Sequence, residues 1–301
     1  MPLTVLVTGA TGFVGSHLAR ALEEEGHHVL AMTRNPDRYD GPGEPVRGDV
    51  FEPRTVAKAM RGVDVAYYLV HSLEDKDFER KDAEAATAFG KAAAKAGVRQ
   101  IVYLGGLGVD DGALSAHLRS RRQVESLLGE GGVPVTVLRA AIVVGHGGIS
   151  WEITRQLVKN LPAMVAPQWV GTKTQPIALR DVVRYLVGVL DNPEAMGRTF
   201  DVGGPEVLTY RDMLRRASQI QNGRDVPIVV VPVLTPDLSS RWLALVTDVD
   251  TTTGRTLIES MNNEVVVKDD SIRKVVPFET MGYDDMVREA LADRLREQGR
   301  L

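Results

Sequence analysis

The chain has 301 residues, 44% hydrophobic and 25% charged, which is the usage of an ordinary globular protein that can bury a sizeable core. A net charge of −4 without a block of lysine or arginine gives a nucleic-acid partner little electrostatic support, and the apolar runs are too short to span a membrane. The absence of cysteine excludes disulfides and thiolate catalysis, and with no signal-like segment we expect a cytoplasmic protein.

The N-terminal segment predicts a strand that turns through glycines into a helix. An apolar run over 3–8 is followed by three evenly spaced glycines, Gly9, Gly12 and Gly15. Apolar residues then recur at helical spacing over 16–26, and a second strand over 28–32 completes a βαβ unit. Such a turn brings backbone N–H groups and a helix N-terminus close to a pyrophosphate. The segment therefore predicts a dinucleotide site rather than a plain turn.

The end of the second strand bears on which dinucleotide is bound. An Asp or Glu at this place would bond the adenosine ribose, whereas an Arg accommodates a 2′-phosphate. The chain reads Met-Thr-Arg-Asn-Pro over 32–36, without a carboxylate. Arg34 therefore favours NADP over NAD. The choice stays open, because a solvated loop arginine, or one stacked on the adenine, fits the same sequence.

The remaining chain keeps alternating strands and helices, which predicts an α/β fold with a doubly wound parallel sheet. Further strands are expected over 46–50, 63–70, 100–104 and 135–139, and helices over 54–60, 77–96 and 115–128. We expect a Rossmann domain from 1–150 and about 176–205. A smaller substrate lobe should comprise 151–175 and 206–301.

Five motifs on this frame resemble the short-chain dehydrogenase/reductase superfamily, in its extended and atypical branches, which include NmrA-like and NADH-dehydrogenase-subunit-like proteins. They are the glycine turn over 8–15, Gly48-Asp49-Val50, Leu138-Arg139 with Gly145, 175–183 and 200–210. The resemblance spans roughly residues 3–215 and implies a nicotinamide cofactor at the carboxyl edge of the sheet. The cofactor-binding residues predicted from the turn and the resemblance are Gly9, Thr11, Gly12, Phe13, Val14, Gly15, Arg34, Asp49, Val50, Leu69, Val70, Gly105, Arg121, Ala140 and Ile142.

The catalytic positions depart from that family's pattern. Redox-active members use a Tyr, a Lys four residues later and a Ser or Thr at the end of the fifth strand. By spacing, His117 stands at the Tyr and Arg121 at the Lys, and the strand ends in Gly105-Gly106. One interpretation makes His117 an acid with a pKa near 6.5 while Arg121 holds the ribose or a phosphate, in an NADP-dependent reduction of a flat, conjugated acceptor.

A second interpretation is a non-catalytic NADP sensor or scaffold, which the two glycines at the serine position also favour. A nucleotide-sugar epimerase or dehydratase is a third, weakened by the missing Tyr-xxx-Lys pair. The substrate is a small molecule that the sequence does not identify, and a homodimer is left open.

Other polar residues offer weaker candidates. His71 follows the fourth strand, where a ligand crevice opens, so it reaches substrate or is a plain loop histidine. His146 is a weaker pocket candidate, and no histidine pair has the spacing of a metal site. The carboxylates over 74–77 and 110–111 suit solvated loops better than an acid–base pair. In the smaller lobe, an apolar wall over the nicotinamide or a lobe core is expected from Trp151, Met164, Trp169, Trp242 and the amphipathic segment 238–246.

Overall fold

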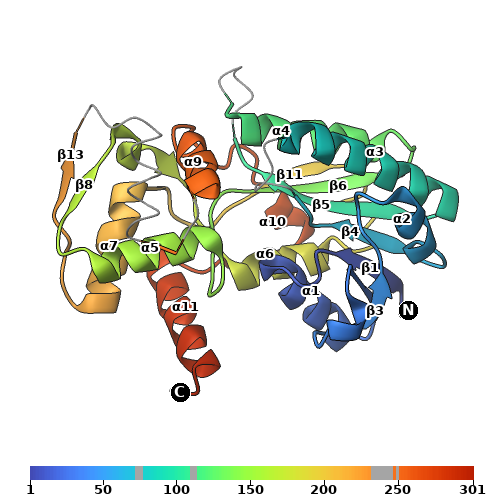
Figure 1. The fold of residues 1–301 in the computed structure, drawn as a ribbon, viewed down its shortest axis with the longest axis horizontal. Coiled ribbons are helices and arrows are strands. Elements are labelled where there is room, and N and C mark those ends of the chain that lie inside the picture. The colour runs from blue at the N-terminus through green and yellow to red at the C-terminus, as the bar shows by residue number, and fades with distance from the viewer. Residues whose placement is uncertain (72–76, 109–113, 232–246, 249–250) are drawn as a thin grey trace.

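The computed structural model describes residues 1–71, 77–108, 114–231, 247–248 and 251–301. In this part of the chain, seven strands form one parallel sheet in the order β11-β6-β5-β4-β1-β2-β3 (Figure 1). Their bounds are β1 Thr4–Thr8, β2 His28–Thr33, β3 Glu44–Arg47, β4 Val65–Tyr68, β5 Gln100–Gly106, β6 Val135–Ala140 and β11 Thr199–Val202. The order reverses between β1 and β4, so the predicted doubly wound sheet is confirmed.

Helices cover both faces of the sheet, which explains why the strands read as continuous apolar runs. One face carries α1 (Phe13–Glu24) and α6 (Leu179–Gly188), and the other carries α2 (Pro53–Ala59), α3 (Phe78–Ala96) and α4 (Ala116–Gly129). In β1, Val5 and Val7 belong to the first buried layer while Leu6 belongs to the second. The side chains of this one strand therefore alternate between two hydrophobic cores.

The third strand differs from its prediction over 46–50, since β3 spans Glu44–Arg47. The Gly48 N–H still donates to the Thr33 carbonyl oxygen at 3.0 Å, but the chain then turns. Asp49 Oδ1 accepts the Phe51 N–H at 3.0 Å, which is an Asx turn, and the Asp49 N–H donates to Thr55 Oγ1 at 2.9 Å. Residues 48–50 thus lead into α2 instead of extending the sheet.

The first helix also begins earlier than the apolar spacing predicts. It starts at Phe13, with Gly12 as the N-cap, so Gly15 lies inside the first turn. The long alanine-rich helix agrees with its prediction: α3 ends at Ala96 and is closed by Gly97 with φ +77°. Glycine thus serves two purposes, close packing in α1 and left-handed backbone after α3.

The smaller lobe packs at the end of the sheet (Figure 1). Its elements are α5 Ile149–Asn160, β8 Met164–Ala166, η2 Gln168–Gly171, β9 Lys173–Thr174, β12 Leu208–Thr209, α7 Tyr210–Asn222, β13 Ile228–Val230, α9 Thr251–Ser260 and α11 Tyr283–Glu297. Trp151 and Met164 are buried in the core of this lobe, which is the lobe-core role that the sequence left open. Trp242, the segment 238–246 and the carboxylates at 74–76 and 110–111 lie outside the described residues.

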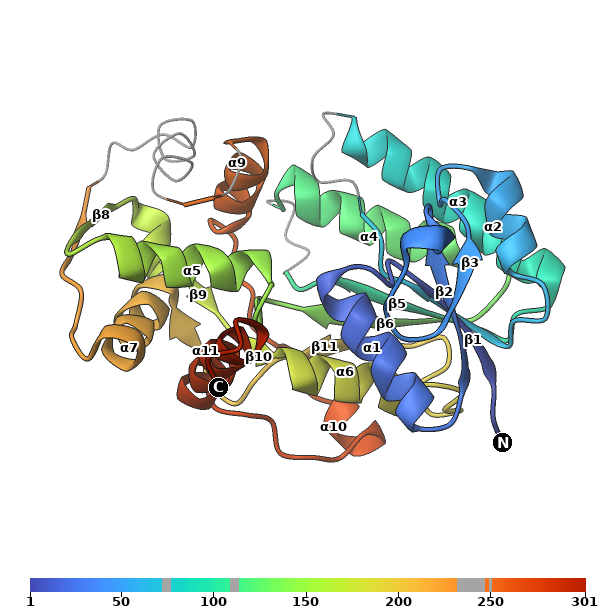
Figure 2. The same cartoon turned by 60° about the horizontal axis from the view of Figure 1, so that its bottom comes forward.

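Four short elements remain in the described part of the chain, and one of them, a helix, packs against the sheet. Strand β7 (Val143–Val144) pairs in parallel with β10 (Ile177–Ala178), and η1 (Pro36–Arg38) follows β2. Helix α10 (Ile272–Val275) lies beside α6 under the sheet (Figure 2), where Ile272 joins the sheet's buried layer. Part of the segment 206–301 therefore packs with the Rossmann domain. Among the described residues, no helix combines the length and apolar character that crossing a membrane requires.

Candidate functional site

A single large cleft of about 1960 Å³ follows the carboxyl edge of the sheet and reaches the smaller lobe. It is lined by all of the residues predicted to bind a cofactor and also by His71 and His117. Residues from β1, β2, β4, β5 and α4 converge there because the carboxyl ends of parallel strands meet at one edge. The structure thus brings the predicted site residues together, and their roles toward a cofactor stay predictions.

The glycine turn is built so tightly that side chains do not fit. Gly9 has φ +67°, and its carbonyl oxygen accepts the Gly12 N–H at 2.8 Å. A β-carbon on Gly15 would stand 2.1 Å from the same Gly9 oxygen. No side chain among the described residues caps the N-terminus of α1. The first N–H groups of this helix therefore face the cleft with the positive end of the helix dipole, and the residues present fit a dinucleotide pyrophosphate.

The end of the cleft beside β2 is basic. The cleft residues at the end of β2, over 32–35, include no carboxylate, and Arg34 is exposed among them. Arg38, at the end of η1, lines the same corner and is also exposed. Sequence reasoning missed Arg38, which lies in a short 3-10 helix after Pro36 and has no motif to mark it. The corner offers two guanidinium groups to an anion.

The opposite end of the cleft holds two histidines and one arginine. Burial and then the charge of Arg121 lower the pKa of His117 to about 3. The charge of Arg121, then burial and then His117 lower the pKa of His71 well below its usual range. Both imidazoles are therefore neutral at pH 7, which differs from the pKa near 6.5 expected for His117. The fixed charge of this cluster belongs to Arg121, whose Nη1 approaches Tyr103 Oη at 3.5 Å.

The wall beside this cluster is backbone. A β-carbon on Gly105 would lie 2.9 Å from Glu125 Oε1 and 3.1 Å from the Tyr103 ring. A β-carbon on Gly106 would lie 2.8 Å from Leu118 Cδ2. The space that a serine side chain would need is thus filled from behind. Backbone, and not a hydroxyl side chain, therefore lines the cleft at Gly105 and Gly106.

A charged network behind the glycines holds the end of β5. Glu125, whose side chain is 9% exposed, lies between Arg122 and Arg139 with contacts of 2.9 and 2.6 Å. Arg122 also donates to the carbonyl oxygens of Gly106 at 3.0 Å and Gly108 at 2.7 Å. Sequence reasoning did not find this network, although Arg122 and Glu125 have the i,i+3 spacing of a helical pair.

The smaller lobe contacts the helix that carries His117. Ser115 caps α4 by accepting the Leu118 N–H at 3.3 Å. The Ser115 N–H donates to Asn263 Oδ1 at 3.1 Å, and its hydroxyl lies 3.1 Å from that of Ser260. The position of His117 in the cleft thus depends on residues that follow it by more than a hundred positions in the sequence.

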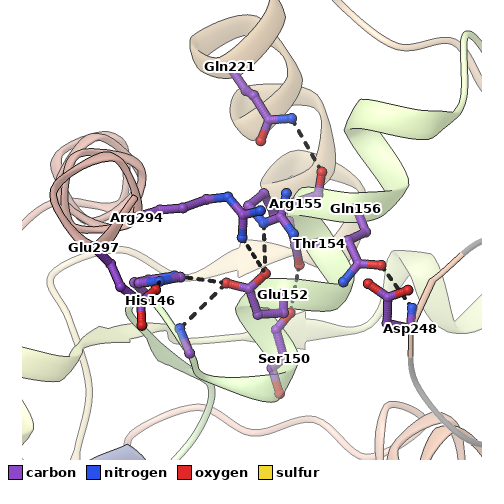
Figure 3. Close-up of polar contacts among 11 residues, drawn as sticks. His146, Ser150, Glu152, Thr154, Arg155, Gln156, Gln221, Asp248, Arg294 and Glu297 are labelled. Carbon is purple, nitrogen blue, oxygen red and sulfur yellow. Dashed lines mark hydrogen bonds and ion pairs between the residues drawn. The ribbon is translucent and has the colours of Figure 1, made fainter. Parts of the chain in front are cut away.

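His146 points toward the C-terminal helix (Figure 3) and is not among the residues that line the cleft. Its Nδ1 lies 3.2 Å from Glu152 Oε1, and its Nε2 lies 2.5 Å from Glu297 Oε2 on α11. The neighbouring Gly147 N–H donates to Glu152 at 3.4 Å, and a β-carbon on Gly148 would stand 2.7 Å from the Phe13 ring. His146 therefore anchors the loop that packs on the glycine turn, and it does not line the pocket.

Comparison with known proteins agrees with this geometry. Residues 9–193 match a family described as NAD(P)H-binding. The chain is 30% identical over 228 residues to a (4-alkanoyl-5-oxo-2,5-dihydrofuran-3-yl)methyl phosphate reductase of Streptomyces griseus, covering 72% of this chain and 73% of the relative. It is 27% identical to an NADH dehydrogenase [ubiquinone] 1 alpha subcomplex subunit 9 of Arabidopsis thaliana, over 70% of this chain and 56% of that one. The Citrobacter sp. triphenylmethane reductase complexed with NADP(H) shares the fold, with a TM-score of 0.75, 18% identity and coverage of 95% and 99%.

Proposed function

The chain belongs to the NAD(P)H-binding family, in keeping with the resemblance of its motifs to short-chain dehydrogenases/reductases, and we propose that it is an NADP-preferring reductase of a flat, conjugated acceptor. The observation that carries the proposal is one continuous cleft. It joins a glycine turn, a basic adenosine corner and a cluster with one fixed positive charge beside a backbone wall.

The preference for NADP rests on Arg34 and Arg38. A 2′-phosphate carries two negative charges, and planar guanidinium groups bind such oxygens in pairs. A carboxylate that would bond the ribose hydroxyls of NAD does not occur among the cleft residues over 32–35. The arginine corner thus supports binding of the phosphorylated cofactor.

The chemistry follows from what the cluster offers at neutral pH. When bound, NADPH supplies a hydride to the acceptor. Negative charge then develops on the acceptor, and the Arg121 guanidinium stabilises it electrostatically. Neutral His117 and His71 donate N–H hydrogen bonds to the acceptor oxygen without first holding an extra proton. The proton that balances the reduction comes from solvent.

The acceptor class follows from the wall and from the relatives. Gly105 and Gly106 line the cleft with backbone, against which a flat ring would lie. Delocalisation in a conjugated acceptor spreads the developing charge, so the reaction depends less on a strong acid. The Streptomyces griseus relative, named as the reductase of an oxo-dihydrofuran, supports a ring that carries a carbonyl group.

The first experiment measures cofactor binding. We expect calorimetric titration to give tighter binding of NADPH than of NADH, and Arg34→Ala to reduce that preference about ten-fold. The matched control is Arg61→Ala, because Arg61 is exposed outside the cleft and should leave both affinities unchanged. Tighter binding of NADH by the parent, or an unchanged preference in Arg34→Ala, contradicts the NADP assignment.

A binding protein without turnover is the second candidate, favoured by the two neutral histidines and by the relative that is named as a subunit of NADH dehydrogenase. The two are separated by NADPH oxidation with quinone and enone acceptors. A reductase turns over and loses rate in Arg121→Gln. A sensor shows no turnover with any acceptor, and its affinity differs between NADPH and NADP⁺.

A further inference from the structure

A second, smaller pocket of about 270 Å³ lies next to the cleft. Its basic lining comes from two helices, with Arg155 and Lys159 on α5 and Arg294 on α11. Gln156 and Asp248 line both the cleft and this pocket, so the two spaces share a wall. Asn160 and Thr247 also line it, so the lining is polar in the part of the chain that the structure describes. We call it the basic pocket.

The basic side chains of this pocket carry more hydrogen-bond donors than protein acceptors satisfy. Glu152 Oε2 accepts from Arg155 Nε at 2.7 Å and lies 3.6 Å from Arg294 (Figure 3). Hydrogen bonds from Arg155 and His146, among others, hold the pKa of Glu152 below its usual value even though burial opposes this, so Glu152 is ionised. Within the described part of the chain, neither the terminal amino groups of Arg155 nor the Lys159 ammonium makes a hydrogen bond.

The charge balance favours an anion. Two of the three cations contact Glu152, and the exposed Asp248 lines the same pocket, so the described residues leave an excess of positive charge. Arg155 contributes most, because its side chain is only 7% exposed and a buried guanidinium is costly unless its donors are satisfied. A neutral or apolar substituent would leave these donors unpaired. A group with several anionic oxygens would satisfy them.

We propose that the basic pocket is the subsite for a phosphomonoester group on the substrate. The inference rests on the proposed function, because the acceptor end of the substrate lies in the adjoining cleft. Three terminal oxygens match cations that converge from α5 and α11, and a guanidinium binds two such oxygens at once. Gln156 on the shared wall marks where the substrate passes from the cleft into the pocket.

A substitution at Lys159 distinguishes anion binding from a purely structural role of the basic pocket. Arg155 and Arg294 both contact Glu152, so they also stabilise the loop that Glu152 holds. Lys159 is exposed and makes no ion pair in the described part of the chain. Lys159→Gln should therefore change anion binding and leave the fold intact.

The test is a calorimetric titration with inorganic phosphate of protein saturated with NADPH, so that the pyrophosphate site is filled. We expect Lys159→Gln and Arg294→Gln each to weaken phosphate binding about ten-fold, and Asp248→Asn to strengthen it. The matched control Arg296→Gln removes the same charge from an exposed position on α11 outside the pocket and should have no effect. Undetectable phosphate binding, or equal binding in parent, Lys159→Gln and Arg294→Gln, overturns the subsite.

The NADPH titration distinguishes failure of the phosphate subsite from failure of the proposed reductase. If NADPH binds and phosphate binding does not respond to these substitutions, only the subsite is wrong. If NADPH does not bind, the proposed reductase is wrong. Phosphate binding to the protein without cofactor, compared between the parent and Lys159→Gln, then still decides whether the basic pocket takes an anion.

Discussion

Gly15→Ala should damage both the stability of the protein and its affinity for the cofactor. The new β-carbon would stand 2.1 Å from the Gly9 carbonyl oxygen and 2.8 Å from its carbon, far inside the ordinary contact distance of 3.4 Å or more. The backbone on one side must move by about 1 Å, and overpacking of this kind costs about 1–3 kcal/mol. The better helix propensity of alanine offsets up to about 1 kcal/mol of it. We expect a net loss of about 1–2 kcal/mol in the free energy of unfolding.

Two other helical glycines provide matched comparisons. A β-carbon on Gly90 in α3 would stand 2.4 Å from the Leu128 carbonyl oxygen, which is a similar clash outside the cleft. A β-carbon on Gly129 in α4 would lie 3.6 Å from Val135 Cγ2, which is an ordinary contact. Gly90→Ala should therefore lose stability but keep its cofactor affinity. Gly129→Ala should keep the affinity and gain up to about 1 kcal/mol.

The assay combines urea unfolding without cofactor and fluorescence titration with NADPH on all three variants. For Gly15→Ala we expect a loss of affinity of about ten-fold or more, because the displaced turn no longer presents its N–H groups to the pyrophosphate. If Gly15→Ala binds NADPH as the parent does, the glycine turn is not the pyrophosphate site. If it is as stable as Gly129→Ala, the clash is relieved without cost and the packing argument is wrong.

Three further predictions follow from the site and its supports. The pKa of His117 is lowered to about 3 in the folded protein, so the unfolded chain binds the proton first and the protein loses stability as the pH falls below about 6.5. Between pH 6.5 and pH 5, His117→Gln should lose about 1 kcal/mol less of its free energy of unfolding than the parent, measured by urea unfolding. Glu125→Gln removes the buried carboxylate that Arg122 and Arg139 both contact and should cost about 2 kcal/mol or more in the same assay. Thr209→Val removes the capping box of α7 and should cost about 1 kcal/mol, seen as a lower Tm.

The parts of the fold that the sequence predicts well are those specified by neighbouring residues. The glycine turn, the flanking strands and α3 with its closing Gly97 depend on local spacing and backbone freedom, which the sequence displays directly. Strand β3 was misplaced because its residues, from Glu44 to Arg47, are exposed or only partly buried and have no clear alternation. Its position is set by pairing with β2, a tertiary contact.

The candidate site likewise has features that the sequence predicts and features that only the tertiary structure sets. The convergence of Gly9, Leu69 and Gly105 on one edge follows from strand order alone, so the cleft was predictable. The spacing of His117 and Arg121 was also visible, but the burial that lowers the His117 pKa was not. The basic pocket joins α5 to the C-terminal helix, and no periodicity of the sequence connects those segments.

The three departures from the family's catalytic pattern fit together physically. A family Tyr–Lys pair supplies a proton, whereas His117 and Arg121 give a neutral imidazole beside a permanent cation. Tyr103 does not replace the missing tyrosine, because it is fully buried, does not line the cleft, and burial raises its pKa despite the nearby Arg121. A site with a fixed charge and no group that titrates near neutrality stabilises a developing anion more readily than it protonates one. We therefore expect turnover with conjugated acceptors to exceed turnover with simple ketones, and to respond to Arg121→Gln more strongly than to His117→Gln.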